Sequence, residues 1–179
     1  QWLHDDLGYA GLILGTNWTT ADERVLGPLD KYCETALDIT AKNTYFGGPN
    51  TRKKFHPWMV GDEYQDKSLL LNPIQTITMH LAYNDHPHFL TEGGYAMPNR
   101  FRTEEQLLMS SYASLQGMDG LFPFTLDSDW ELTHNKWPIQ TPATFGQYPA
   151  AALIYRRGYV KEGPVVIKEA LKLDDLYAM

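Results

Sequence analysis

Residues 86–94 read HPHFLTEGG, in which a short apolar run meets one carboxylate, Glu92, and two glycines follow at once. This order is typical of a buried parallel strand that ends at an acidic side chain. Enzymes built from parallel strands and helices carry their chemistry at the carboxyl ends of the strands. The alternative is a solvated glutamate at an ordinary strand–loop junction, so the surrounding segments decide between the two interpretations.

Strand-like and helix-like segments alternate along the chain, which predicts a parallel α/β sheet. Strands are expected at 11–15, 37–45, 87–91 and 120–124. Helices are expected at 1–8, at 20–36 with a break at Gly27-Pro28, at 72–84, at 103–117, and at 142–157 with a fresh start near Gly146. Four such units are half of a (β/α)₈ barrel, which typically has about 250 residues. The chain is therefore predicted to form a (β/α)₄ half of a TIM barrel over residues 1–160. Residues 161–179 are expected to be a C-terminal extension or the start of an accessory segment.

The composition narrows the function classes. With 179 residues, 43% of them hydrophobic, one core and one domain are expected. The net charge of −7 argues against a nucleic-acid surface, and no apolar run approaches the roughly 18 residues of a membrane span. The single Cys33 cannot form an internal disulfide and leaves the compartment open. Five Trp, eleven Tyr and seven Phe favour a sugar-binding surface, because aromatic rings stack on apolar sugar faces, although cores use them too.

Five stretches, taken in order, resemble the C-terminal half of the clan A glycoside hydrolases, the cellulase- and β-galactosidase-like TIM barrels. They are Gly15–Trp18, Asp38 with Asn43–Tyr45, Phe89–Glu92, Tyr112–Gly120 and Ala151–Val160. Their order and spacing carry the resemblance, which covers most of the chain. It implies that the four expected strands are strands five to eight of the barrel.

The resemblance also implies roles for three residues. Glu92 corresponds to the catalytic nucleophile at the end of strand seven, which attacks the anomeric carbon to give a covalent glycosyl-enzyme. Tyr45, at the tip of strand six, corresponds to the aromatic residue that hydrogen-bonds and positions the nucleophile. Asn43 stands where the family often has His; an amide can bind a sugar hydroxyl but does not titrate near neutral pH.

Further side chains at the strand tips are predicted to bind the sugar. Asn17 and Trp18 follow the first strand, and core packing is the alternative for Trp18. The family usually offers a sugar-stacking Trp at the tip of strand eight. Phe124 at that place fits the core, which leaves Trp130 as the expected platform, and Trp137 in the same loop is a further candidate for a subsite.

A retaining hydrolase needs a second carboxyl about 5–5.5 Å from the nucleophile as its acid/base. In the family this glutamate follows an Asn at the end of strand four, and the chain has no Asn-Glu pair. Strand four itself would lie upstream of Gln1. Asp127, Asp129 and Glu131 follow the last expected strand, where one of them is a candidate substitute and a solvated loop is the alternative.

The sequence gives no reason to expect a cofactor or a metal. His86 and His88 are two residues apart without a nearby third ligand, and His86 precedes the strand, at the opposite end from Glu92. A half-barrel leaves two strand edges open, so we expect a homodimer or a complementary N-terminal half to complete it.

The expected function is a retaining glycoside hydrolase acting on β-linked poly- or oligosaccharides. The alternative is a non-catalytic carbohydrate-binding or assembly half-barrel that lacks the acid/base. A polysaccharide substrate favours a secreted or periplasmic location.

Overall fold

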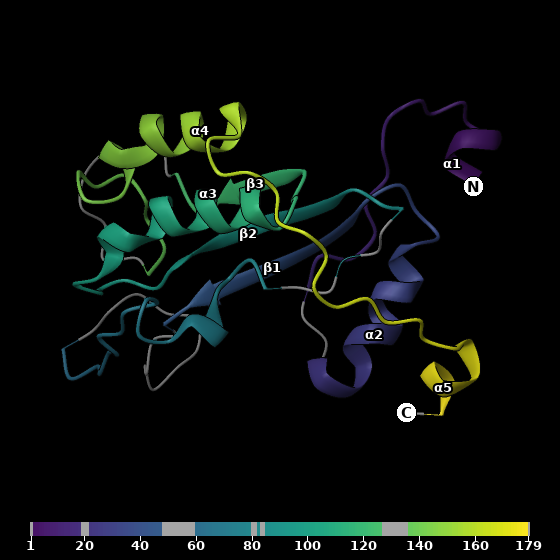
Figure 1. Cartoon of the computed structure of the whole chain (residues 1–179), viewed down its shortest axis with the longest axis horizontal. Coiled ribbons are helices and arrows are strands. Elements are labelled where there is room, and N and C mark those ends of the chain that lie inside the picture. Colours follow the sequence, from purple (N-terminus) through teal and green to yellow (C-terminus); the bar gives the residue numbers. More distant parts are fainter. Residues whose placement is uncertain are drawn as a thin grey trace.

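The computed structural model describes residues 2–18, 22–47, 60–79, 82, 85–126 and 136–178. Within these ranges lies a sheet of three parallel strands in the order β1 (Thr40–Phe46), β2 (His88–Tyr95) and β3 (Gly120–Pro123). The α-helices are α1 (Trp2–Asp5), α2 (Glu23–Glu34), α3 (Glu105–Leu115), α4 (Tyr148–Arg157) and α5 (Leu173–Tyr177) (Figure 1). The 3-10 turns are η1 (Pro73–Gln75), η2 (Arg102–Glu104) and η3 (Phe145–Gln147). The predicted α/β class with a parallel sheet is confirmed.

In place of the first predicted strand, an irregular segment runs alongside β1. It forms an isolated parallel bridge at Leu14. The backbone N–H of Asp38 donates to the carbonyl of Ile13 at 3.1 Å, and that of Asn43 to the carbonyl of Asn17 at 2.8 Å. Asn17 comes four positions after Ile13, whereas Asn43 comes five positions after Asp38. Because the two segments advance by different numbers of residues, a regular ladder does not continue between these contacts.

Two predicted helices differ in the structure. The break at Gly27-Pro28 is wrong, because α2 runs unbroken through both residues. A proline inside a helix removes one backbone hydrogen bond, and here the contacts of α2 with β1 outweigh that loss. The helix expected at 72–84 is, within the described residues, the 3-10 turn η1, and Asn72 makes no capping hydrogen bond with its side chain. The fresh start near Gly146 is confirmed, since η3 leads directly into α4.

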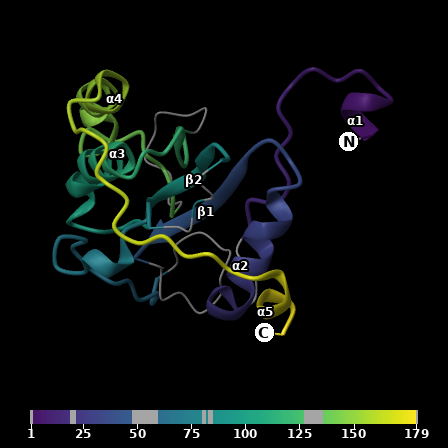
Figure 2. The same ribbon diagram turned by 45° about the vertical axis from the view of Figure 1, so that its right-hand side comes forward.

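The main core lies between the sheet and α3. α3 and α4 lie side by side over one face of the sheet, as the two views in Figures 1 and 2 show. The buried apolar residues of this core are Phe46, Leu69, Ile77, Leu90, Tyr95, Met109, Ala113 and Met118. Because side chains alternate along a strand, the neighbours of Phe46 and Leu121 point to the other face of the sheet.

A buried network of charges fastens α2 to β1. Lys42 is only 1% exposed, and its Nζ donates to Asp30 at 2.7 Å. Lys31 Nζ donates to Glu34 at 3.0 Å and to the carbonyl of Ala41 at 2.8 Å, while Glu34 also accepts the N–H of Ala41 at 2.8 Å. Burial lowers the pKa of Lys31. These contacts hold α2 against β1.

Glu105, in the first turn of α3, is fully buried next to the end of β2. Burial raises the pKa of its carboxyl from 4.5 to about 8, although the Tyr95 N–H and the Gln106 amide donate hydrogen bonds to it. Between these two pH values the folded protein holds a proton that the unfolded chain has released. We therefore expect Glu105 to make the free energy of unfolding fall as pH rises through this window, by up to about 1.4 kcal/mol per pH unit.

Urea unfolding of the wild type and of Glu105→Gln at several pH values between 5 and 8 measures this contribution. The Gln variant keeps the shape of the side chain but does not titrate, so its stability is expected to vary less with pH. Parallel pH dependences of the two proteins would assign the effect to other groups.

Candidate functional site

A β-bulge at Thr91 sets the direction in which Glu92 points. Up to Leu90 the pairing of β2 with β1 is regular, but then Glu92, and not Thr91, lies opposite Asn43. The pairing of β2 with β3 shifts in the same place. In a regular strand Glu92 would share the core face with Leu90. The extra residue turns Glu92 to the opposite face, where Tyr45 lies.

Tyr45 and Glu92 form the centre of the site. The Tyr45 hydroxyl donates a hydrogen bond to Glu92 Oε2, and both side chains are half-buried. Tyr45 is the penultimate residue of β1, whereas Glu92 lies within β2, because this strand continues to Tyr95 and does not end at Thr91 as predicted. Burial, and then the contact with Glu92, raise the pKa of the Tyr45 phenol, so it keeps its proton and remains a donor at neutral pH. Glu92 Oε1 has no hydrogen-bond partner within the described part of the chain. The predicted pairing of these two residues in space is present in the structure.

An aromatic wall stands beside Tyr45. Its ring centroid lies 4.3 Å from that of Trp137, at an interplanar angle of 43°, and 6.0 Å from that of Phe124 in an edge-on arrangement. The N–H of Thr125 donates to the carbonyl of Trp137 at 2.8 Å, which holds the returning loop against the end of β3. Trp130, the predicted platform, lies outside the described residues, and Trp137 is the tryptophan that the structure brings to this place.

The other predicted substrate residues have different environments, and Asn43 is the one that lies directly opposite Glu92. Asn43 is buried. Its side-chain oxygen accepts a hydrogen bond from the Thr91 hydroxyl at 2.8 Å, and its backbone N–H donates to the carbonyl of Asn17. Asn43 thus links the bulge to the irregular N-terminal segment. Trp18, next to Asn17, is 60% exposed and belongs to no core, so core packing does not account for it.

The two glycines after Glu92 are required by close packing. A Cβ on Gly93 would lie 2.5 Å from Leu90 Cδ2, because the bulge turns both residues to the same face. A Cβ on Gly94 would lie 2.8 Å from the carbonyl oxygen of Phe124, which is backbone and cannot rotate away. The backbone and the core beside Glu92 therefore leave no room for a side chain at either position.

Gly94→Ala is expected to lower the free energy of unfolding by about 1–3 kcal/mol, because the added methyl must push the Phe124 backbone away. Gly146→Ala is the matched control, since nothing lies within 4 Å of a Cβ at Gly146. Urea unfolding of both variants measures the difference. Equal stabilities would show that the strand ends around Gly94 yield without cost.

Sequence reasoning missed Thr91 as the residue that orients the site. The signal was present, because two consecutive polar residues, Thr91 and Glu92, interrupt the strand pattern just before two glycines. Such an interruption predicts a bulge, and bulges are frequent beside active sites.

The histidines have partners of their own away from Glu92. His86 contacts Asp85 at 3.0 Å and the carbonyl of Thr35 at 3.1 Å, and His88 contacts the Thr40 hydroxyl at 3.1 Å. In the described ranges, no three His, Cys, Asp or Glu side chains are grouped to hold a metal. The acidic candidates at 127, 129 and 131 lie outside those ranges. A further finding for the described residues is that no helix is long and apolar enough to cross a membrane.

The arrangement at Glu92 is suited to nucleophilic chemistry. A neutral phenol fixes one carboxylate oxygen and leaves the other accessible to a ligand, beside an aromatic wall. In the described part of the chain, the hydrogen-bond partner of the Glu92 carboxylate is a phenol and not a second carboxyl. Comparisons of the chain with protein-family models, with curated proteins and with solved structures find no match.

Proposed function

We propose that this chain is the nucleophile-bearing half of a retaining β-glycoside hydrolase. The hydrogen bond from Tyr45 to Glu92, in the carboxyl-terminal halves of adjacent parallel strands, is the observation that carries the proposal. A nucleophilic carboxylate must be ionised and held in one orientation. The phenol meets the second requirement, since it holds Oε2 by a hydrogen bond and leaves Oε1 for the substrate.

The reaction proceeds in two steps, formation of a glycosyl ester and its hydrolysis. Glu92 Oε1 forms a bond to the anomeric carbon while the glycosidic C–O bond breaks, and the leaving oxygen takes a proton from a general acid. Water then attacks the glycosyl ester, its proton passes to the same acid/base, and the Glu92 carboxylate is regenerated. The acid/base comes from a homodimer partner or from a complementary N-terminal half.

A (β/α)₄ half-barrel is the finer fold that we propose. The segment before β1, β1 itself, β2 and β3 run in parallel, with α3 and α4 over one face. A parallel sheet normally has both faces covered. Phe122 is 52% exposed on the face that also carries Tyr45 and Glu92, which supports completion of that face by further strands.

Trp18 and Trp137 are the proposed sugar-binding platforms, together with the amides of Asn17 and Asn43. Trp18 is exposed at the end of the N-terminal segment, and Trp137 flanks Tyr45. Two exposed or half-buried tryptophans on separate segments fit an extended β-linked chain of sugars better than a single small ligand.

Covalent trapping tests the proposal without the acid/base. A dinitrophenyl leaving group needs no protonation, and a 2-fluoro substituent slows hydrolysis of the ester. A panel of 2-deoxy-2-fluoro-β-glycosides of dinitrophenol is therefore expected to add one sugar to the chain, and peptide mapping is expected to place it on Glu92.

The second candidate is a non-catalytic carbohydrate-binding half-barrel. It is favoured by the absence of a carboxyl partner for Glu92 among the described residues. Binding of a β-linked oligosaccharide, measured by calorimetry, with no label from any reagent of the panel would support this candidate against the hydrolase.

A further inference from the structure

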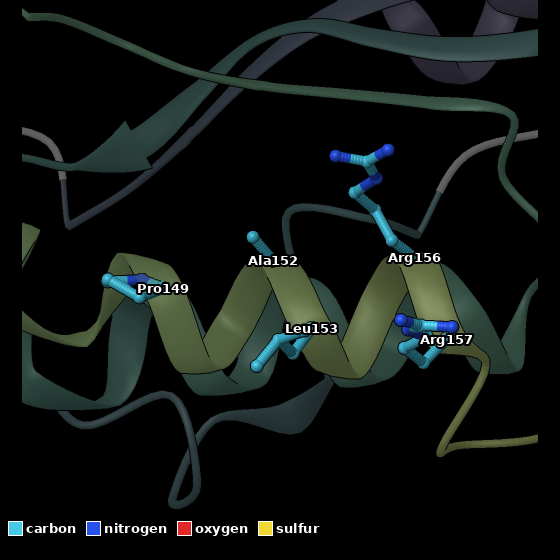
Figure 3. Close-up of a pocket in the computed structure, with 5 residues that line it drawn as sticks. All are labelled: Pro149, Ala152, Leu153, Arg156 and Arg157. Carbon is cyan, nitrogen blue, oxygen red and sulfur yellow. The ribbon is translucent and has the colours of Figure 1, made fainter.

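One face of α4 carries a stripe of residues against which no other element packs in the described part of the chain. Its residues are spaced three and four apart and therefore share one face of the helix. They are Pro149, Ala152, Leu153, Arg156 and Arg157, which line a depression of about 530 Å³ (Figure 3). Leu153 is 50% exposed, and neither arginine forms an ion pair within the described part of the chain. The α4 stripe thus combines an apolar floor with two free cations.

α1 and the turn after it have the complementary character. Trp2, Leu3 and Leu7 are 62%, 39% and 59% exposed, and no residue of α1 is buried. Asp5 and Asp6 are exposed and form no ion pair with any described residue. This acidic and apolar segment is the match in charge and polarity for the α4 stripe.

The two surfaces cannot meet within one molecule. Both Figure 1 and Figure 2 show α1 apart from the sheet, at the opposite end of the molecule from α4. His4 fixes α1 there, because its ring contacts Asp38 at 3.2 Å, immediately before β1. α1 of one molecule therefore reaches an α4 stripe only on another molecule.

We propose that two copies of the chain form a two-fold dimer in which α1 of each copy binds the α4 stripe of the other. Asp5 and Asp6 then face Arg156 and Arg157, and the exposed apolar side chains of both surfaces are covered together. An exchange of this kind closes after two copies and buries two equal contacts.

The topology favours a second copy as the occupant. α1 leads into the segment that runs alongside β1, at one edge of the sheet. α4 comes after β3 in the sequence, and β3 is at the other edge. α1 and α4 are thus connected in the chain to opposite edges of the described sheet, and unpaired strand edges are a liability that a second copy can cover. The dimer is also the partner that the proposed hydrolase needs, and for that role the inference rests on the proposed function.

Charge reversal tests the dimer independently of any activity. By light scattering after gel filtration, the wild type is expected at twice the 20.5 kDa mass of one chain. Arg156→Glu/Arg157→Glu and Asp5→Lys/Asp6→Lys are each expected at the mass of a single chain. An equimolar mixture of the two variants is expected to regain the double mass, because reversed charges meet at one contact and native charges at the other.

Lys161→Glu/Lys168→Glu is the matched control, since both lysines are exposed and outside the two surfaces. It is expected to keep the double mass, and circular dichroism confirms the fold of every variant. A wild type of single mass up to about 100 µM overturns the proposal, as do charge-reversed variants that stay dimeric. A dimer that Glu92 reagents do not label would overturn the hydrolase and leave the dimer standing.

Discussion

Glu92→Gln is expected to lower the rate of cleavage of an activated aryl β-glycoside by about 10⁴-fold or more and to abolish covalent labelling. The amide keeps the shape of the side chain and an oxygen to accept the Tyr45 hydrogen bond, but it is not a nucleophile. The variant should therefore fold normally and bind the sugar while it fails in the chemical step. Initial rates with the dinitrophenyl glycoside and mass spectrometry of the chain measure both effects.

Tyr45→Phe separates attack from orientation. The ring remains beside Trp137, but the hydrogen bond to Glu92 is lost. A smaller rate loss of about 10²-fold is expected, with labelling that is slower but complete. A loss as large as that of Glu92→Gln would give Tyr45 a direct part in the chemistry.

The stereochemistry of azide rescue decides between the two roles that a glutamate can have. In Glu92→Ala a small anion fits the vacated space and attacks from the side where the carboxylate stood. A nucleophile variant therefore gives an α-glycosyl azide from a β-glycoside, whereas loss of an acid/base gives the β-azide. Isolation of the β-azide would move Glu92 to the acid/base role, and an unchanged rate in Glu92→Gln would remove it from the mechanism.

Element type was predictable where the local pattern and the tertiary contacts agree. The runs around Leu90 and Leu121 became strands because both are apolar, short and bounded by glycine or polar residues. α3 ends at Leu115, two residues before the predicted stop at Gly117, which has a φ of +65°. The apolar run around Leu14 has the same local signature, yet its spacing relative to β1 does not permit a regular ladder. Local pattern alone does not contain that relation.

The same distinction between local pattern and tertiary contacts applies to the candidate site. The resemblance implied that Tyr45 and Glu92 lie together on adjacent strands, and the structure has them in contact. The face on which Glu92 lies depends on the bulge at Thr91, and the place of Trp137 depends on the backbone pairing of its loop with Thr125. The local sequence signals a bulge but does not fix its register with β1, and the pairing of the Trp137 loop is a contact between distant segments.

The charge network under β1 leads to the largest expected effect on stability. Glu34→Ala is expected to lower the free energy of unfolding by about 3–5 kcal/mol, because it leaves the Lys31 ammonium buried without its counter-charge and the Ala41 N–H without an acceptor. Urea unfolding at pH 7, followed by far-UV circular dichroism, measures the loss. Glu162→Ala is the control, since Glu162 is exposed, and it should lie within about 0.5 kcal/mol of the wild type.

The double variant Lys31→Met/Glu34→Leu tests why the pair is there. Glu34 Oε1 has no hydrogen-bond partner among the described residues, so the buried pair does not satisfy all of its polar atoms. Apolar replacement of both partners removes that deficit and is expected to recover most of the stability lost in Glu34→Ala. A double variant as unstable as Glu34→Ala would mean that the hydrogen bond to Ala41 dominates. Since β1 also carries Asn43 and Tyr45, a stable double variant with slower Glu92 labelling would show that the network holds Tyr45 in register with the nucleophile.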